Sequence, residues 1–115
     1  MNYLRNNVQL IGNVGNTPET MTFESGKKVS RFSLATNDYY LKDGEKVQQT
    51  EWHNLVAWGK LADLIETYVD KGKEIAIVGK LISRSYGSEN GDKKHFTEVV
   101  VNEILFLGNK ENNRQ

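Results

Sequence analysis

The stretch TEWHNLVAWGKL, residues 50–61, decides the fold. Side chains of an extended strand alternate between its two faces, so Trp52 and Trp58 fall on one face with the amide of Asn54 between them. Leu55 and Ala57 fall on the opposite face and suit a small core. We therefore expect a strand with one buried face and one face that carries two indole rings.

The face with the two indole rings is interpreted as a binding surface. Aromatic rings beside polar groups on a sheet suit stacking on flat ligands, and nucleic-acid bases are the common flat ligand. One base stacked on an aromatic side chain contributes about 1–3 kcal/mol. The alternative is that both tryptophans pack in a core. The polar side chain of Asn54 between them favours the binding surface.

Length and composition limit the class of protein. A chain of 115 residues and 13.1 kDa forms one domain that buries roughly two-thirds of its unfolded surface. The absence of cysteine excludes disulfides, thiol catalysis and thiolate zinc sites. No apolar run approaches the ~20 residues that span a bilayer, and the first residues lack the apolar segment of a signal peptide. We therefore expect a soluble, cytoplasmic protein.

The overall charge does not by itself indicate nucleic acid. Fifteen Lys and Arg residues balance fifteen Asp and Glu residues, and the pI is near 6.7. A nucleic-acid-binding protein is expected to carry a basic surface. Because net charge is a sum, however, a basic groove requires only that the two signs be segregated locally.

The other strands are indicated by alternating or apolar runs between turn residues. They are expected at residues 6–14, 20–24, 28–38, 73–86 and 95–107. Turns and loops are expected at residues 16–19, 25–27, 42–46 and 87–94. Gly12 is expected to mark a bulge or bend in the first strand.

One segment has the period of a helix. Its apolar residues recur at helical spacing, at Leu61, Leu64, Ile65 and Tyr68. The pattern predicts a helix from Lys60 to Lys71, with Lys71 in the last turn and Gly72 as the C-terminal cap.

The order of the elements indicates a fold. If the hairpin of residues 20–24 and 28–38 is counted as the second strand, the chain has five strands with one helix between the third and the fourth. This is the order of the OB-fold, an all-β, five-stranded Greek-key barrel that binds oligonucleotides. Small barrels with other functions share this order. Residues 1–108 are expected to form the barrel domain, and residues 109–115 a short polar tail.

Further aromatic and basic residues are candidates for the same surface: strand parity puts Arg31, Lys80, Arg84 and Tyr86 on non-core faces, Tyr40 lies where its strand runs into the hairpin tip, and Lys60 follows the tryptophan strand. The candidates for stacking on bases are Tyr40, Trp52, Trp58 and Tyr86. The candidates for phosphate contacts are Arg31, Lys60, Lys80 and Arg84. Interleaved cations and aromatic rings on neighbouring strands form a stacking platform in a positively charged groove. For Tyr40 and its neighbour Tyr39, a solvated tyrosine pair is the alternative.

Five blocks of the sequence, taken together, resemble the bacterial single-stranded DNA-binding protein family over about residues 3 to 107. The blocks are VQLIGNVGNTPE, RFSLATN, TEWHNLVAWGKLA, KGKEIAIVGKL and TEVVVNEI. The resemblance implies base-stacking aromatic residues at the ends of ATNDYY, TEW, LVAW and LISRSY. Those ends are Tyr40, Trp52, Trp58 and Tyr86. The family usually has tryptophan at the positions of Tyr40 and Tyr86, so the stacking area is expected to be smaller here.

The resemblance also implies an assembly and a tail. Members of the family usually form homotetramers, and the family's match to His53 lies at a subunit contact. Their chains continue into a flexible linker with an acidic tip that recruits replication and repair proteins. This sequence reaches Gln115 without such a tip, through Lys110 and Arg114. Partners recruited by a tip are therefore not expected, and whether the tip is naturally absent stays open.

Other chemistry is disfavoured. His53 and His95 are the only histidines, and without a close spacing motif they do not indicate zinc. No nucleophile, phosphate-binding glycine loop or paired-carboxylate motif is present, so we expect neither a cofactor nor an enzyme.

The sequence therefore predicts a nucleoid-associated OB-fold protein. It is expected to bind single-stranded DNA with little sequence preference, by aromatic stacking and phosphate contacts, and to protect it during DNA replication, recombination and repair. The alternative is an OB-fold protein-interaction module of replication or restart machinery with weak DNA affinity, which the zero net charge favours.

Overall fold

The computed structural model describes residues 4–87 and 93–107. The elements in chain order are β1 (Val8–Val14), β2 (Glu19–Thr22), β3 (Lys28–Lys42), β4 (Glu45–Trp58), α1 (Lys60–Tyr68), β5 (Glu74–Gly87) and β6 (Lys93–Phe106). The predicted loop 87–94 lies mostly outside the described residues, and the predicted tail 109–115 lies wholly outside them.

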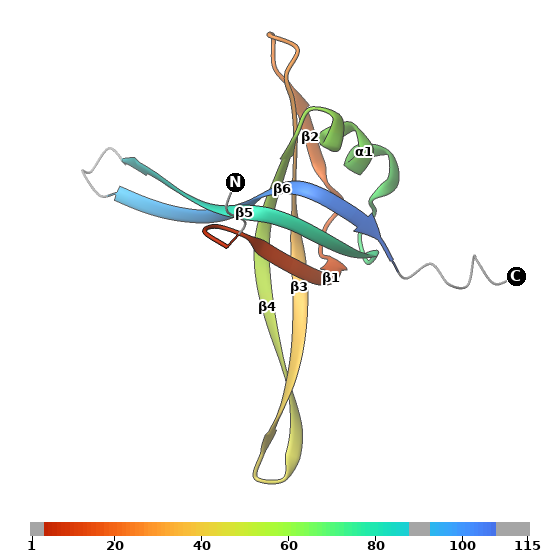
Figure 1. The fold of residues 1–115 in the computed structure, drawn as a ribbon, viewed down its shortest axis with the longest axis vertical. Coiled ribbons are helices and arrows are strands. Elements are labelled where there is room, and N and C mark those ends of the chain that lie inside the picture. Colours follow the sequence, from red (N-terminus) through yellow and green to blue (C-terminus); the bar gives the residue numbers. More distant parts are fainter. Residues whose placement is uncertain (1–3, 88–92, 108–115) are drawn as a thin grey trace, which may run out of the picture.

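The strands form one sheet that closes on itself (Figure 1). The strand order is β1-β5-β6-β4-β3-β2, and β1 also pairs with β3. Strands β1, β5, β6, β4 and β3 therefore make a closed barrel, and α1 lies between its third and fourth strands in the chain. This confirms the predicted OB-fold. The segment expected at residues 20–24 is the short strand β2, which pairs with β3 outside the closed ring.

The barrel closes at Gly12, where β1 passes from one partner strand to another. Gly12 is opposite Ile75 of β5, and the next residue, Asn13, pairs with both β5 and Ala35 of β3. A Cβ on Gly12 would collide with the carbonyl group of Ala35, so glycine allows the two backbones to meet. Of the bulge or bend predicted at Gly12, the bulge is excluded, because the pairing with β5 continues through Gly12 without a register shift. The register shift lies at Val78 and Gly79 instead.

The core is built from alternate residues of the strands and one face of the helix. Its most buried members include Leu34, Leu55, Ile65, Ile75 and Ile77. Ile65 comes from α1, which packs against β3 and β4 at one end of the barrel (Figure 1). The predicted core face of the tryptophan strand is confirmed, since Leu55 is 2% exposed and joins the core cluster.

The helix is shorter than predicted. It begins at Lys60 as expected but ends at Tyr68, because Val69 has extended backbone angles and buries its side chain in the core. The predicted roles of Lys71 and Gly72 are therefore wrong. Gly72, with φ of 91°, lies in the turn that Lys73 N–H closes on the carbonyl of Asp70. The need to bury Val69 overrides the helical pattern.

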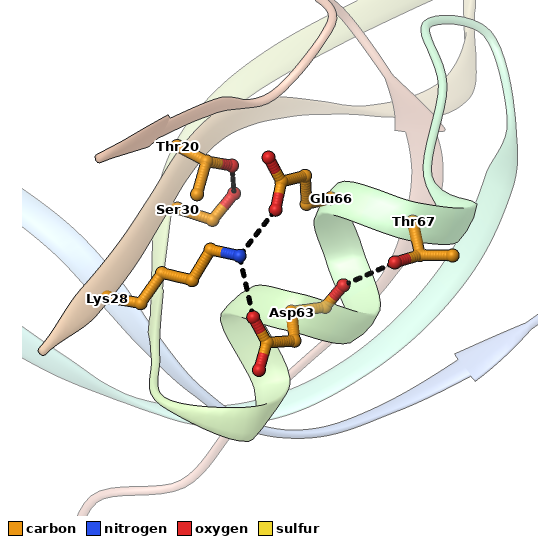
Figure 2. A network of polar contacts seen from close by, with 6 residues as sticks. All are labelled: Thr20, Lys28, Ser30, Asp63, Glu66 and Thr67. Carbon is orange, nitrogen blue, oxygen red and sulfur yellow. Dashed lines mark hydrogen bonds and ion pairs between the residues drawn. The ribbon is translucent and has the colours of Figure 1, made fainter. Parts of the chain in front are cut away.

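A cluster of polar contacts fastens α1 to β3 (Figure 2). Lys28 Nζ lies 2.7 Å from Asp63 Oδ1 and 2.5 Å from Glu66 Oε1. The pKa of the Lys28 ammonium is raised by its hydrogen bonds, of which the one to the Asp63 carboxylate has the larger effect and the one to Glu66 the smaller. Both bonds favour the charged form of Lys28. We call these three residues the lysine cluster.

Strands β3 and β4 extend beyond the barrel as a long twisted hairpin (Figure 1). Its turn consists of Asp43 and Gly44, whose φ angles are 54° and 84°. Two successive residues with positive φ are typical of the tight turn whose twist matches that of the flanking strands. The predicted polar tip at residues 42–46 is therefore confirmed, and the hairpin carries Tyr39 and Tyr40 away from the barrel.

Candidate nucleic-acid interface

Strands β3, β4, β6 and β5 are neighbours and expose one continuous face away from the core. Residues opposite one another across the strands share a face, as Arg31 and Val56 do. We call this side the outer face and define it by Arg31, Ser33, Trp52, Asn54, Val56, Trp58, Lys80, Ile82, Arg84, Phe96, Glu98 and Val100. It contains both tryptophans and the three predicted cations that lie on strands.

Trp52 is the most exposed aromatic side chain of the outer face. Its exposed fraction is 62%, and its backbone is opposite that of Ala35 on β3. The indole ring lies over Gly15, where an added Cβ would collide with Trp52 Cζ3 and come within 2.7 Å of Ser33 Oγ. Glycine at position 15 therefore gives the ring room to lie against the barrel with its other side open. The predicted strand did not reveal this contact, since Gly15 is distant in sequence.

Trp58 already has an aromatic partner. Its ring stacks on Phe23, with centroids 6.2 Å apart and planes inclined by 23°. Lys27 Nζ lies 5.7 Å from the Trp58 ring centroid, within the range of a cation–π interaction. The turn between β2 and β3 thus adds Phe23 and Lys27 to the site. Sequence reasoning missed both, although Lys27 belongs to the turn that it predicted at residues 25–27 and Phe23 lies just before that turn.

The two tyrosine candidates, Tyr40 and Tyr86, lie near the ends of strands β3 and β5. Tyr40 is 47% exposed, but it is five residues from Ala35 and so falls on the face opposite that of Trp52. Its neighbour Tyr39 shares the parity of Trp52, and Lys46 Nζ lies 4.5 Å from its ring centroid. Tyr86 of β5 is opposite Lys94 of β6, and the side chain of Tyr86 is not among those that the structure describes.

The two arginine candidates are joined by a third residue that sequence reasoning missed. Arg31 Nη1 lies 3.0 Å from Glu98 Oε1, and Arg84 Nη1 lies 3.1 Å from Glu98 Oε2. The Glu98 side chain is 2% exposed, whereas those of Arg31 and Arg84 are 42% and 50% exposed. We call these residues the arginine cluster. The available signal was a carboxylate directly before the apolar run of residues 99–101.

The two lysine candidates lie in different surroundings. Lys80 is exposed on β5, opposite Val100. Lys60 is exposed at the first position of α1 and lines an open hollow with Lys27 and Lys28. The structure therefore gathers Arg31 and Arg84 into one cluster with Lys80 on the same face, while Lys60 lies beyond Trp58 at the start of the helix.

His53 faces away from the tryptophans. It is half-buried, opposite Leu34, and its Nε2 lies 3.0 Å from Thr36 Oγ1. Within residues 4–87 and 93–107, no three His, Cys, Asp or Glu residues come together as metal ligands would. No helix in this part of the chain has the length and apolar character that crossing a membrane requires.

Comparisons with known proteins show which family the chain is related to. The single-strand binding protein family matches residues 5–107. The single-stranded DNA-binding protein 1 of Chlorobaculum tepidum is 44% identical over 108 residues, which cover 92% of this chain and 67% of that protein. The single-stranded DNA-binding protein of Bacteroides thetaiotaomicron is 41% identical, with coverage of 91% and 67%.

A solved structure is similar over nearly the whole chain. It is that of the Plasmodium falciparum SSB in complex with ssDNA, with a TM-score of 0.82 and 33% sequence identity. The match covers 94% of this chain and 100% of that one.

Proposed function

Because the chain belongs to the single-strand binding protein family, we propose that it binds single-stranded DNA with little sequence preference and protects it during replication, recombination and repair. The observation that carries this proposal is the outer face, where the 62% exposed ring of Trp52 lies on the same side as two partly exposed arginines. Stacking is tolerant of sequence because every base has a π-face. We propose no catalytic activity, and the function places the protein in the cytoplasm, on the nucleoid.

The candidate residues, some on the outer face and some beyond it, divide between the base and the phosphate of a nucleotide. We assign base stacking to Trp52, Trp58, Tyr40 and Tyr86, and phosphate contacts to Arg31, Lys60, Lys80 and Arg84. Trp52 has one open side for a base, because its other side lies on Gly15. Trp58 offers the side of its ring that Phe23 leaves open. Tyr40 would be reached by DNA that continues onto the hairpin of β3 and β4.

Titration with oligo(dT) tests the proposed function. The two tryptophans are the only ones in the chain, so quenching of their fluorescence reports on the outer face. Affinity should fall as salt rises, because neutralising phosphates releases counterions with a slope of about −0.7 per contact to a single strand. The absence of binding at low salt would favour the protein-interaction module, which the zero net charge supports.

We also propose that the chain assembles as a homotetramer. Ile11, Ala76 and Leu105 are opposite one another across β1, β5 and β6, and Ile11 and Leu105 are 57% and 61% exposed. Such an apolar stripe on a sheet surface is typical of a contact between subunits. His53, for which the family resemblance implies a subunit contact, lies on β4, opposite Leu34 of β3 and outside this stripe.

Light scattering tests the assembly. The chain at micromolar concentration should give four times the monomer mass of 13.1 kDa. Leu105→Glu should lower this mass, because it places a charge in the apolar stripe, and a bulky change at His53 should loosen the assembly. A monomer mass for the unchanged chain would contradict the proposal. Leu105→Thr is the matched control, since it changes the same position but introduces a small, uncharged side chain.

A further inference from the structure

Glu98 is a buried carboxylate on the outer face of the sheet, the side away from the core cluster. On the same strand, Val99 and Val101 point into the core. Because side chains alternate along a strand, Glu98 points outward, and it is opposite Ile82 of β5. Its side chain is nevertheless only 2% exposed. A buried carboxylate costs several kcal/mol unless it is paired and hydrogen-bonded. What surrounds Glu98 must therefore compensate its charge.

The two oxygens of Glu98 have separate partners on different strands. Oε1 accepts a hydrogen bond from Arg31 of β3, at 3.0 Å, and Oε2 accepts one from Arg84 of β5, at 3.1 Å. Since the strand order is β5-β6-β4-β3, the Arg31 pair crosses β4, on the side where Val56 is 1% exposed. One carboxylate thus fixes two guanidinium groups that come from opposite sides of β6.

The cluster presents positive charge to the solvent. It contains two cations and one anion, and the anion is the buried member. Each guanidinium carries five N–H donors and gives Glu98 one hydrogen bond through Nη1. The exposed parts of Arg31 and Arg84 therefore keep donors for an anion that approaches from outside. Such an anion need not displace the carboxylate that lies beneath them.

We propose that Glu98 is a positioning residue that holds Arg31 and Arg84 in place for backbone phosphates of single-stranded DNA. The inference rests on the proposed function, which assigns the two arginines to phosphate contacts. Ordering a long side chain on binding opposes association, so two arginines that are ordered beforehand bind phosphate more tightly. If Glu98 instead competed with phosphate for the arginines, its removal would strengthen binding. The two roles therefore predict effects of opposite sign.

The substitution Glu98→Gln separates these roles. The amide keeps an oxygen for one arginine but turns N–H donors toward the other, so the cluster opens. We expect the affinity for oligo(dT) to fall about three- to tenfold, the loss that accompanies ordering one or two side chains on binding. Asp70→Asn is the matched control, because it removes one negative charge from the exposed turn after α1. Its affinity should be unchanged or slightly higher.

A double-mutant cycle with Arg84 distinguishes positioning from a merely structural role. Arg84→Met leaves Glu98 paired with Arg31 and should cost about two- to fivefold in affinity, as loss of an exposed ion pair does. In the Glu98→Gln protein the same change should alter affinity by less than about 1.5-fold, since coupled residues are not additive. Full additivity would overturn the proposal, as would an unchanged or higher affinity in folded Glu98→Gln.

A second variant guards against a failure to fold. Glu98→Asp keeps the charge but is shorter by one methylene, so one carboxylate no longer reaches both arginines. If Glu98→Gln does not fold, circular dichroism will show it, and Glu98→Asp should then show the loss of affinity without a change of net charge. Unchanged affinity in Glu98→Asp would in that case overturn the role of Glu98. If the unchanged chain does not bind oligo(dT), the proposed function fails first, and this proposal fails with it.

Discussion

The arginine cluster and the lysine cluster each have one member on β3, Arg31 and Lys28, but the two clusters arrange their charges in opposite ways. In the arginine cluster, one carboxylate is buried and two cations are 42% and 50% exposed. In the lysine cluster, Lys28 is 26% exposed and its two carboxylates are 61% and 51% exposed. In each cluster, the residue that binds the other two is the least exposed of the three. Because Glu98 is buried, the arginine cluster turns positive charge to the solvent, and because Lys28 is the least exposed of its cluster, the lysine cluster turns negative charge to the solvent. Neutral composition therefore does not prevent a basic surface.

The two clusters also differ in what they join. The arginine cluster links β3, β6 and β5 across the outer face, where Trp52 is exposed. The lysine cluster links β3 to α1 at the end of the barrel, with two acidic residues outward (Figure 2). Phosphate is attracted by the exposed guanidinium groups of the first cluster and repelled by the exposed carboxylates of the second. We therefore expect substitutions in the first region to change DNA affinity, and substitutions in the second to change stability alone.

The largest difference between the regions is expected from exposed aromatic residues. Trp52→Ala should weaken oligo(dT) binding about tenfold or more, since one stacked base contributes about 1–3 kcal/mol. Tyr68→Ala is the control, because Tyr68 is 56% exposed on α1, the helix that also carries Asp63 and Glu66 of the lysine cluster. Its affinity should match that of the unchanged chain in the same anisotropy titration. Equal losses of affinity in the two variants would show that DNA binds no more strongly to the outer face than to the side of the helix.

A smaller difference is expected from the cations themselves. Arg84→Met should lower affinity about two- to fivefold and reduce the salt slope by about 0.7, because one phosphate contact is lost. Lys28→Met, which also removes one positive charge, should change neither quantity, since the Lys28 ammonium is engaged by Asp63 and Glu66. The measurement is affinity at several salt concentrations. A slope that changes equally in both variants would contradict the assignment of phosphate contacts.

The smallest effect is expected in the stability of the lysine cluster. Lys28→Met should lower Tm at neutral pH by at most a few degrees, because exposed ion pairs contribute little. The pKa of Lys28 is raised on folding from its usual 10.5, so its contribution is fully present below about pH 10.5 and is lost as pH rises through the folded pKa. The Tm difference between the two proteins should therefore disappear at high pH. A constant difference would indicate that packing of the lysine stem, and not its charge, matters.

Much of the fold follows from local patterns in the sequence. Alternation placed Leu55 and Ala57 in the core and both tryptophans on the outer face, as the structure shows. The start of the helix at Lys60 follows from its period, but its end does not. Val69 belongs to the core in extended conformation, a requirement set by the barrel. The partner of Gly12 likewise depends on where the barrel closes.

The contacts of the candidate site were less accessible to sequence reasoning. Arg31, Arg84 and Glu98 come from three strands, and their meeting requires the order β5-β6-β4-β3, in which β4 and β6 are parallel. The parity of one strand cannot give this order. The same limit hid the contacts of Gly15 with Trp52 and of Phe23 with Trp58. Parity did predict which residues face outward, but it did not predict which of them are already partnered.

The central claim is that single-stranded DNA lies on the outer face against Trp52. Trp58→Phe leaves Trp52 as the only tryptophan, so its fluorescence reports on one position. The account predicts saturable quenching of Trp52 by oligo(dT), at DNA concentrations that match binding measured by anisotropy and that rise with salt. Binding by anisotropy without any change in Trp52 emission would place the DNA elsewhere on the protein and would contradict the account.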